Sequence, residues 1–305
     1  MGRVHVKTMQ GMGDCFAARH VLNELARGND LSIETPWPQL FTGVQGAELV
    51  KPEPSPLRSQ QRNVDTWWPK KERPGTCTMV RPQREVQLSY SFGPERASIP
   101  EQLAECCGVS PKWDRFGPPA SRPGFTHLGL FRQATLRTEY YNVARNPDPL
   151  AIPTVVQLLQ KNGIEWLHLN DLWADGEAEL QSRAGGFVTG HGEVLDGPPY
   201  TASAMACRGE FSLVTLLDLV ERATCIVAPM SWLAWAGAAM GIPTLVVMGG
   251  FASAEKIFGP CRPRTLVVLE PKPFCACYNP RHQCEKYLSH EELVGGVEKL
   301  LDVMR

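Results

Sequence analysis

The stretch Arg3-Val-His-Val-Lys-Thr-Met-Gln-Gly-Met-Gly-Asp14 predicts a strand, a glycine turn and the start of a helix over 15–26. A second stretch of this kind runs from Cys225-Ile-Val-Ala-Pro229 through Met230-Ser-Trp-Leu233 into a small-residue helix and the strand Thr244-Leu-Val-Val-Met248. Each stretch places a turn at the carboxyl end of a buried strand, where parallel α/β sheets bind their ligands. Helix N-termini at such turns favour phosphates. Two units of this kind predict two sheets that face each other across a cleft.

The 305 residues are enough for two domains. Strand and helix patterns alternate in both halves, which predicts parallel sheets covered by helices. Strands are expected over Glu85–Phe92 and Glu165–Leu169, and helices over Ile99–Cys107 and His290–Met304. The segment Phe116-Gly-Pro-Pro-Ala-Ser-Arg-Pro-Gly124 contains too much proline and glycine for a helix or a central strand, so it is expected to be a linker. We therefore predict an α/β protein with two Rossmann-like domains, over 1–124 and 125–305.

The composition excludes several classes of protein. Apolar residues make up 43% of the chain and charged residues 21%, with a net charge of −1, as in ordinary globular proteins. There is no apolar run of about 18 residues that would predict a membrane span, and the absence of a signal segment at the start predicts a cytoplasmic protein. The sequence has no P-loop, no complete Gly-x-Gly-x-x-Gly after the first strand and no Gly-x-Ser-x-Gly. ATPase chemistry and hydride transfer are therefore disfavoured.

Asp14, at the turn into the first helix, has two interpretations. Aspartate is a favoured N-cap residue, because its carboxylate accepts hydrogen bonds from the first amides of a helix. A carboxylate at the mouth of a cleft can also take a proton from an acceptor hydroxyl as a general base. Its neighbours on the acceptor side of the expected cleft are Lys7, Gly11, Met12 and Gly13.

The second half of the chain carries groups suited to a diphosphate and a nucleoside. Arg132, Thr135 and Arg137 follow a strand, and guanidinium groups bind phosphate oxygens bidentately, although Arg137 and Glu139 could equally form a surface ion pair. Ser231 could donate to a phosphate, while Trp232 could stack on a base or form part of the cleft wall. Glu210 could bind ribose hydroxyls or act as an acidic residue in the first turn of a helix.

Four of the ten cysteines lie close together near the end of the chain, Cys261, Cys275, Cys277 and Cys284, with His282 among them. Thiolates and imidazole are the ligands of tetrahedral metal sites, so a structural zinc or iron ion is one interpretation. The spacing is not the usual Cys-x₂-Cys, and a reduced cysteine-rich loop, or a disulfide formed only on oxidation, is the alternative. Catalysis is expected to need no cofactor.

Residues 51–73 combine prolines with an excess of basic side chains and the pair Trp67-Trp68. This composition predicts a long surface loop. Basic side chains with neighbouring tryptophans would also suit a nucleic acid, whose bases stack on aromatic rings.

The motif Val4-His-Val-Lys-Thr-Met-Gln-Gly-Met-Gly-Asp14 resembles the start of glycosyltransferase family 9, the ADP-heptose:lipopolysaccharide heptosyltransferases. The run 210–223 and Gly241-Ile-Pro-Thr244 are similar to the donor-site signature of that family. The signature normally contains Asp-Thr-Gly and then a histidine, whereas this chain has Met230, Ser231, Trp232 and Trp235 there. The segment 132–140 also resembles one in phage-encoded relatives.

This resemblance implies a metal-independent glycosyltransferase of the GT-B architecture, with an acceptor-side Rossmann-like domain over 1–124 and a nucleotide-sugar-binding Rossmann-like domain over 125–305. Asp14 would be the base, and Arg132 would bind the diphosphate of a nucleotide-diphosphate sugar. The acceptor would be a glycan, or a hydroxylated DNA base if the chain is a phage enzyme. A binding protein that has kept the fold and lost catalysis remains an alternative, because fold does not determine function.

Overall fold

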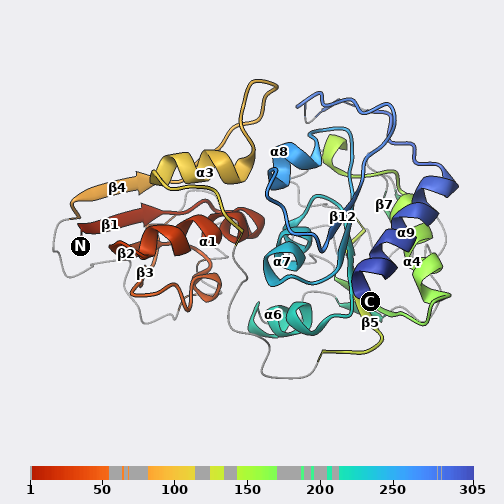
Figure 1. Ribbon diagram of the computed structural model, residues 1–305, viewed down its shortest axis with the longest axis horizontal. Helices are drawn as coiled ribbons and strands as arrows, with labels where there is room; N and C mark the ends of the chain where they lie inside the picture. Colours follow the sequence, from red (N-terminus) through yellow and green to blue (C-terminus); the bar gives the residue numbers. More distant parts are fainter. Residues whose placement is uncertain are drawn as a thin grey trace.

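The computed structural model describes residues 2–54, 64, 68, 82–113, 124–133, 143–169, 187–188, 194–195, 205–207, 213–279, 281–282 and 284–305. Most of the expected linker lies outside these residues, as do Trp67, Thr135, Arg137 and Glu210. Two parallel sheets lie side by side, with helices between them (Figure 1). The fold is of the α/β class with two Rossmann-like sheets, as the sequence predicts.

The N-terminal sheet has four parallel strands in the order β3-β2-β1-β4, namely β1 (Gly2–Lys7), β2 (Asn29–Glu34), β3 (Glu48–Val50) and β4 (Arg84–Gln87). One face packs on α1 (Met12–Ala26) and α3 (Ile99–Cys107) through buried side chains such as Val4, Val6 and Leu22. Alternate residues of β1 therefore point to the opposite face, which is polar.

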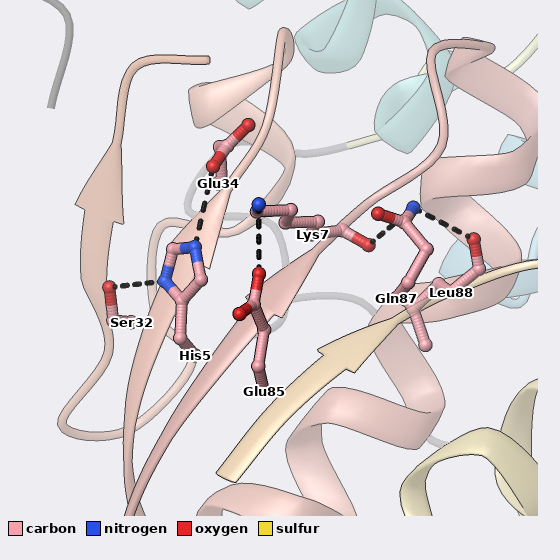
Figure 2. A network of polar contacts seen from close by, with 7 residues as sticks. All are labelled: His5, Lys7, Ser32, Glu34, Glu85, Gln87 and Leu88. Carbon is pink, nitrogen blue, oxygen red and sulfur yellow. Dashed lines mark hydrogen bonds and ion pairs between the residues drawn. The ribbon is translucent and has the colours of Figure 1, made fainter. Parts of the chain in front are cut away.

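Ion pairs and hydrogen bonds link neighbouring strands on this polar face (Figure 2). His5 contacts Ser32 and Glu34, at 3.1 and 3.3 Å. The ammonium group of Lys7 lies 2.8 Å from the carboxylate of Glu85. Because neighbouring side chains across a sheet interact directly, the pairs of opposite charge support the strand register.

The C-terminal sheet has six parallel strands in the order β12-β11-β10-β5-β6-β9. Its strands are β5 (Leu128–Phe131), β6 (Glu165–Leu169), β9 (Met205–Cys207), β10 (Ile226–Ala228), β11 (Thr244–Val247) and β12 (Leu266–Leu269). A separate pair, β7 (Phe187–Val188) and β8 (Val194–Leu195), is antiparallel.

Both faces of the C-terminal sheet are covered. Leu245 and Val247 pack with α4 (Ala151–Gln160) and α9 (His290–Met304), while Val246 faces the core that includes α6 (Leu213–Arg222) and α7 (Trp232–Met240). The short helix α8 (Ala254–Phe258) follows β11. The two covered faces explain the uninterrupted apolar run of β11, as expected for a buried parallel strand.

The two domains share one apolar core. Helix α1 packs against α7, and the buried residues of both helices belong to the same cluster. The ring of Trp113 stacks on Trp235 at 5.6 Å, and its indole N–H donates to the carbonyl of Phe258 over 3.1 Å. Phe92 meets Phe251 edge-on at 4.8 Å. Large apolar interfaces restrict the relative motion of domains, so these contacts hold the two sheets in a defined arrangement.

Three described residues in the expected surface loop over 51–73 are buried, namely Pro52, Val64 and Trp68. Val64 is 1% exposed and Trp68 7% exposed, and the indole N–H of Trp68 donates to the carbonyl of Thr35 over 2.7 Å. At these positions the prediction of a surface loop is wrong, and the ring of Trp68 is not available to stack on a base. Nowhere in the described parts of the chain is there a helix long and apolar enough to cross a membrane.

Candidate active site and metal site

Asp14 belongs to the first turn of α1 and is not its cap. The helix begins at Met12, and Gly11 occupies the N-cap position. A Cβ placed on Gly11 would clash with Oδ2 of Asp14, so a larger residue here would require the carboxylate to move. The N-cap interpretation is therefore corrected: Asp14 folds back toward the helix start from inside the first turn.

Tyr90, in the segment that follows β4, is hydrogen-bonded to the carboxylate of Asp14. Its hydroxyl donates to Oδ1 of Asp14 over 2.7 Å. Burial raises the pKa of Asp14, while the hydrogen bond from Tyr90, the charge of Arg145 and the backbone N–H of Gly11 act to lower it. The carboxylate therefore loses much of its hydration and receives instead the hydrogen bonds and charge that favour ionised groups.

Two guanidinium groups come from the C-terminal domain. Arg132 follows β5 and is 2% exposed, and Arg145 ends the short helix η2 (Val143–Arg145). Arg145 donates to the carbonyl of Met230 over 3.1 Å. Burial lowers the pKa of Arg145, and the charge of Arg132 lowers it further. Two cations close enough to influence each other, with the carboxylate of Asp14 nearby, form a region suited to an anion.

His168, at the end of β6, is neutral at physiological pH. Burial lowers its pKa to about 3, and the charge of Arg132 acts in the same direction. Its ring stacks on Phe131 at 4.4 Å. His168 therefore lines the strand ends beside Arg132 without adding to the positive charge.

The start of α7 offers hydrogen-bond donors in the same region. Ser231 is in the N-cap position but makes no capping hydrogen bond with its side chain. It is 4% exposed, and its Oγ has no hydrogen-bond partner among the residues that the structure describes. The first amides of a helix and an uncommitted hydroxyl favour an anionic ligand.

The starts of α1 and α7 meet across the domain interface. A Cβ placed on Gly13 would lie 3.4 Å from Cα of Trp232 and 3.2 Å from Cδ1 of Trp235. Glycine at this position permits the close approach of the two helices. Trp235 is buried against Trp113, so it forms part of the interdomain wall, while Trp232 is half-buried beside the glycine turn.

Lys7 is not part of the site around Asp14, because its side chain pairs with Glu85. Its hydrogen bond to Glu85 raises the pKa of Lys7 and holds the ammonium group on the polar face of the N-terminal sheet (Figure 2). Met12 is half-buried and packs against the shared core. Thr135, Arg137 and Glu210 were predicted on the donor side and lie outside the described residues.

Tyr90 and Arg145 were not predicted from the sequence. The sequence predicts a strand over Glu85–Phe92, whereas β4 ends at Gln87, so Tyr90 follows the carboxyl end of a strand adjacent to β1. A shorter predicted strand would have placed Tyr90 at the sheet edge where ligands bind. Arg145 carries no comparable signal, because its segment has neither a motif nor a periodic pattern.

The cysteine loop forms a cluster of possible metal ligands. Cys275, Cys277, His282 and Cys284 each offer a ligand atom, and these atoms all lie within 4.8 Å of one another. Sγ of Cys277 lies 3.3 Å from Sγ of Cys284, and Nδ1 of His282 lies 3.4 Å from the latter sulfur. Cys261 is exposed and is not part of this cluster. Of the four predicted cysteine ligands the structure thus gathers three, with His282 as the fourth group.

The donor set fits a transition metal. Three thiols and one imidazole are a common ligand set of tetrahedral zinc sites, and sulfur ligands also suit iron. Ligands about 2.3 Å from a tetrahedral ion lie roughly 3.5–3.8 Å apart, near the separations found here. The loop is held beside β11, because the backbone N–H of Tyr278 donates to the carbonyl of Phe251 over 3.0 Å.

Comparison with solved structures identifies glycosyltransferases of similar fold. The iron-containing dodecameric glycosyltransferase TibC from enterotoxigenic E. coli H10407 matches with a TM-score of 0.68 at 13% identity, over 100% of this chain and 77% of TibC. ADP-heptose lps heptosyltransferase II of E. coli matches with a TM-score of 0.58 at 12% identity, over 99% of this chain and 98% of its own. A glycosyl transferase family 9 protein from Veillonella parvula DSM 2008 gives 0.57 at 11% identity, over 99% and 97%.

The sequence matches no protein-family model, and comparison with curated proteins finds no relative. At 11–13% identity the structural matches establish the GT-B fold, which agrees with the architecture predicted from the sequence. TibC has also been solved in complex with ADP-D-β-D-heptose.

Proposed function

We propose that this protein is a glycosyltransferase that moves a sugar from a nucleotide-diphosphate sugar to an acceptor hydroxyl. The observation that carries the proposal is the arrangement at the domain interface: the carboxylate of Asp14 on one side, and Arg132 and Arg145 on the other. The free Oγ of Ser231 at the start of α7 supports it further. The structural likeness to heptosyltransferases makes a heptose-like donor sugar the first candidate.

In this proposal Asp14 takes the proton of the acceptor hydroxyl as its oxygen bonds to the anomeric carbon. The bond between that carbon and the diphosphate oxygen breaks, and the nucleoside diphosphate leaves with the bonding electrons. Arg132, Arg145 and the first amides of α7 stabilise the negative charge that develops on the leaving group, which is the main electrostatic demand of the reaction. The acceptor is a hydroxyl compound that approaches from the side of α1.

Calorimetry with ADP and turnover of ADP-D-β-D-heptose test the proposal. Replacing Arg132 with glutamine removes a charge-assisted phosphate contact and should weaken ADP binding by about 1.5–3 kcal/mol. Asp14→Asn should lower turnover by about 10²-fold or more, because a general base is lost. The matched controls are Arg305→Gln and Asp302→Asn, whose side chains are 80% and 70% exposed in one ion pair at the chain end. Normal turnover in Asp14→Asn would exclude the proposed mechanism.

We further propose that Cys275, Cys277, His282 and Cys284 hold a structural zinc or iron ion. The compact donor set supports this, as does the likeness to iron-containing TibC. When bound, the ion would supply a cross-link for a loop that has little regular secondary structure, and no step of the transfer is assigned to it.

Metal analysis of the purified protein tests this site. Cys277→Ser and His282→Ala should lose the ion and lower the melting temperature, while Cys261→Ser should retain both, because Cys261 lies outside the ligand cluster. Equal metal content in all three variants would contradict the assignment.

A further inference from the structure

The hydrogen bond between Tyr90 and Asp14 joins two positions 76 residues apart, one in the segment after β4 and the other in the first turn of α1. The phenol and the carboxylate meet at 2.7 Å, a normal length for a charge-assisted hydrogen bond from a hydroxyl. The ring of Tyr90 is itself held by Phe92, which it meets edge-on at 5.3 Å. The hydroxyl is thus presented to Asp14 by a ring whose orientation is restricted by packing.

We infer that Tyr90 is a positioning residue for Asp14. The inference rests on the proposed function, in which Asp14 is the base. One oxygen of the carboxylate accepts from Tyr90, while the other lies over Gly11. Rotation of the carboxylate would break the contact with Tyr90. Its remaining lone pairs therefore keep a constant direction for an acceptor hydroxyl.

The protonation states agree with these roles. Burial and the charge of Asp14 raise the pKa of Tyr90 well above its usual value, so the phenol remains a donor at physiological pH. Burial also raises the pKa of Asp14, and the charge of Arg145 and the hydrogen bond from Tyr90 oppose this effect. Without Tyr90 and Arg145, the carboxylate would hold its proton to higher pH and would be a base in a smaller fraction of molecules.

Besides Tyr90 and Arg145, the backbone N–H of Gly11 favours the ionised form of Asp14. Cys15, the next residue of α1, has its pKa raised to about 12 by burial and stays a neutral thiol. The facing start of α7 contributes Ser231 and Trp232, which carry no charge. The charge of Arg132 acts to lower the pKa of Arg145, the cation whose charge favours ionised Asp14. The charge balance of the base is therefore set by both domains.

Carbon-13 NMR of labelled aspartate carboxyls measures this directly, with the Asp14 signal assigned by its loss in Asp14→Asn. In Tyr90→Phe, which keeps the packed ring, the Asp14 titration should move to higher pH. Tyr287→Phe is the matched control, because Tyr287 is 68% exposed, and it should leave the titration unchanged. An identical Asp14 titration in wild type and Tyr90→Phe would overturn the inference.

Arg145 offers a second, independent pair of variants. Arg145→Gln removes the charge and should also move the Asp14 titration to higher pH, whereas Arg145→Lys keeps the charge and should move it less. Equal titrations for wild type, glutamine and lysine would exclude the contribution from the opposite domain.

Kinetics then separate positioning from folding. With ADP-D-β-D-heptose as donor, Tyr90→Phe should lower kcat by about 10²-fold with little change in KM, the size expected when a catalytic group is misplaced. The acidic limb of its pH profile should shift with the NMR titration, and in an Asp14→Asn background the substitution should have no further effect. An additive loss in that background would overturn the positioning role. If instead Asp14→Asn turns over normally, the proposed function fails, while the NMR result on Tyr90 stands by itself.

Discussion

The two sheets of this protein are buried to different extents. In the described residues, helices α1 and α3 cover one face of the N-terminal sheet, and the other face carries ion pairs such as Lys7–Glu85 (Figure 2). The C-terminal sheet has α4 and α9 on one face and α6 and α7 on the other (Figure 1). Parallel strands buried on both faces are apolar throughout, and strands with one polar face alternate. Val4-His-Val-Lys7 and Thr244-Leu-Val-Val247 illustrate the two patterns.

The two domains, which differ in how deeply their sheets are buried, also contribute different groups to the proposed site. The N-terminal domain contributes a carboxylate held by a phenol, and the C-terminal domain contributes two guanidinium groups and a helix start. Both contributions come from segments that follow the carboxyl ends of strands, where parallel sheets bind ligands. The apolar core shared by α1 and α7 brings these segments together. The C-terminal sheet and its helices therefore fix the position of α1 and of Asp14.

The largest contrast in stability should appear between matched truncations on the two sheets. Leu245 in β11 is 0% exposed, and Leu245→Ala should cost about 2–5 kcal/mol of the free energy of unfolding, because it leaves a cavity. Lys7→Ala on the polar face removes an exposed ion pair and should cost about 1 kcal/mol or less. Urea unfolding followed by fluorescence measures both. Similar costs would mean that the polar face of the N-terminal sheet is buried as deeply as β11.

An intermediate effect is expected where α9 meets the C-terminal sheet. A Cβ on Gly296 would lie 2.7 Å from Cδ1 of Leu269, so Gly296→Ala should destabilise the protein by about 1–3 kcal/mol through overpacking. Its neighbour Gly295 has no atom within 4 Å of the corresponding position, and Gly295→Ala should be neutral or stabilise by up to about 1 kcal/mol. Thermal unfolding distinguishes the two variants. A stabilising Gly296→Ala would contradict the close packing of α9 on this face.

The smallest effect concerns α3, which covers the apolar face of the N-terminal sheet. The side chain of Ser98 and its backbone N–H, at 2.9 Å, donate to Glu101 and lower the pKa of its carboxyl. A lowered folded-state pKa stabilises the protein above the unfolded pKa, and this contribution is lost as the pH falls through the folded pKa. Glu101→Gln should therefore cost about 0.3–1 kcal/mol at pH 7.

That cost should disappear in acid, because protonation removes the charge from wild type as well. Melting temperatures of wild type and Glu101→Gln between pH 7 and pH 3 follow the loss. Glu105→Gln, on the exposed last turn of the same helix, is the control and should not destabilise at pH 7. A constant difference between wild type and Glu101→Gln across this pH range would show that the charge is not responsible.

The local pattern of apolar residues predicts most helices and strands of the fold. The strand over Glu165–Leu169 and the helices over Ile99–Cys107 and His290–Met304 have the bounds that their apolar spacing predicts. The strand expected over Glu85–Phe92 is shorter, because β4 leaves the sheet after Gln87. The helix α8 was not predicted, since five residues are too few to establish a periodic pattern.

The sequence by itself determined the two-sheet architecture, the glycine turn that carries Asp14, and three of the four groups in the metal cluster. These features depend on the spacing of residues along a short stretch of chain, so hydrophobic periodicity and turn residues are enough to predict them. Only the tertiary structure decided that Tyr90 donates to Asp14, that the charge of Arg145 acts on the same carboxylate, and that Trp68 is buried against Thr35. These partners are distant in the chain, and they meet because strand order and domain packing bring together positions whose separation in sequence carries no signal.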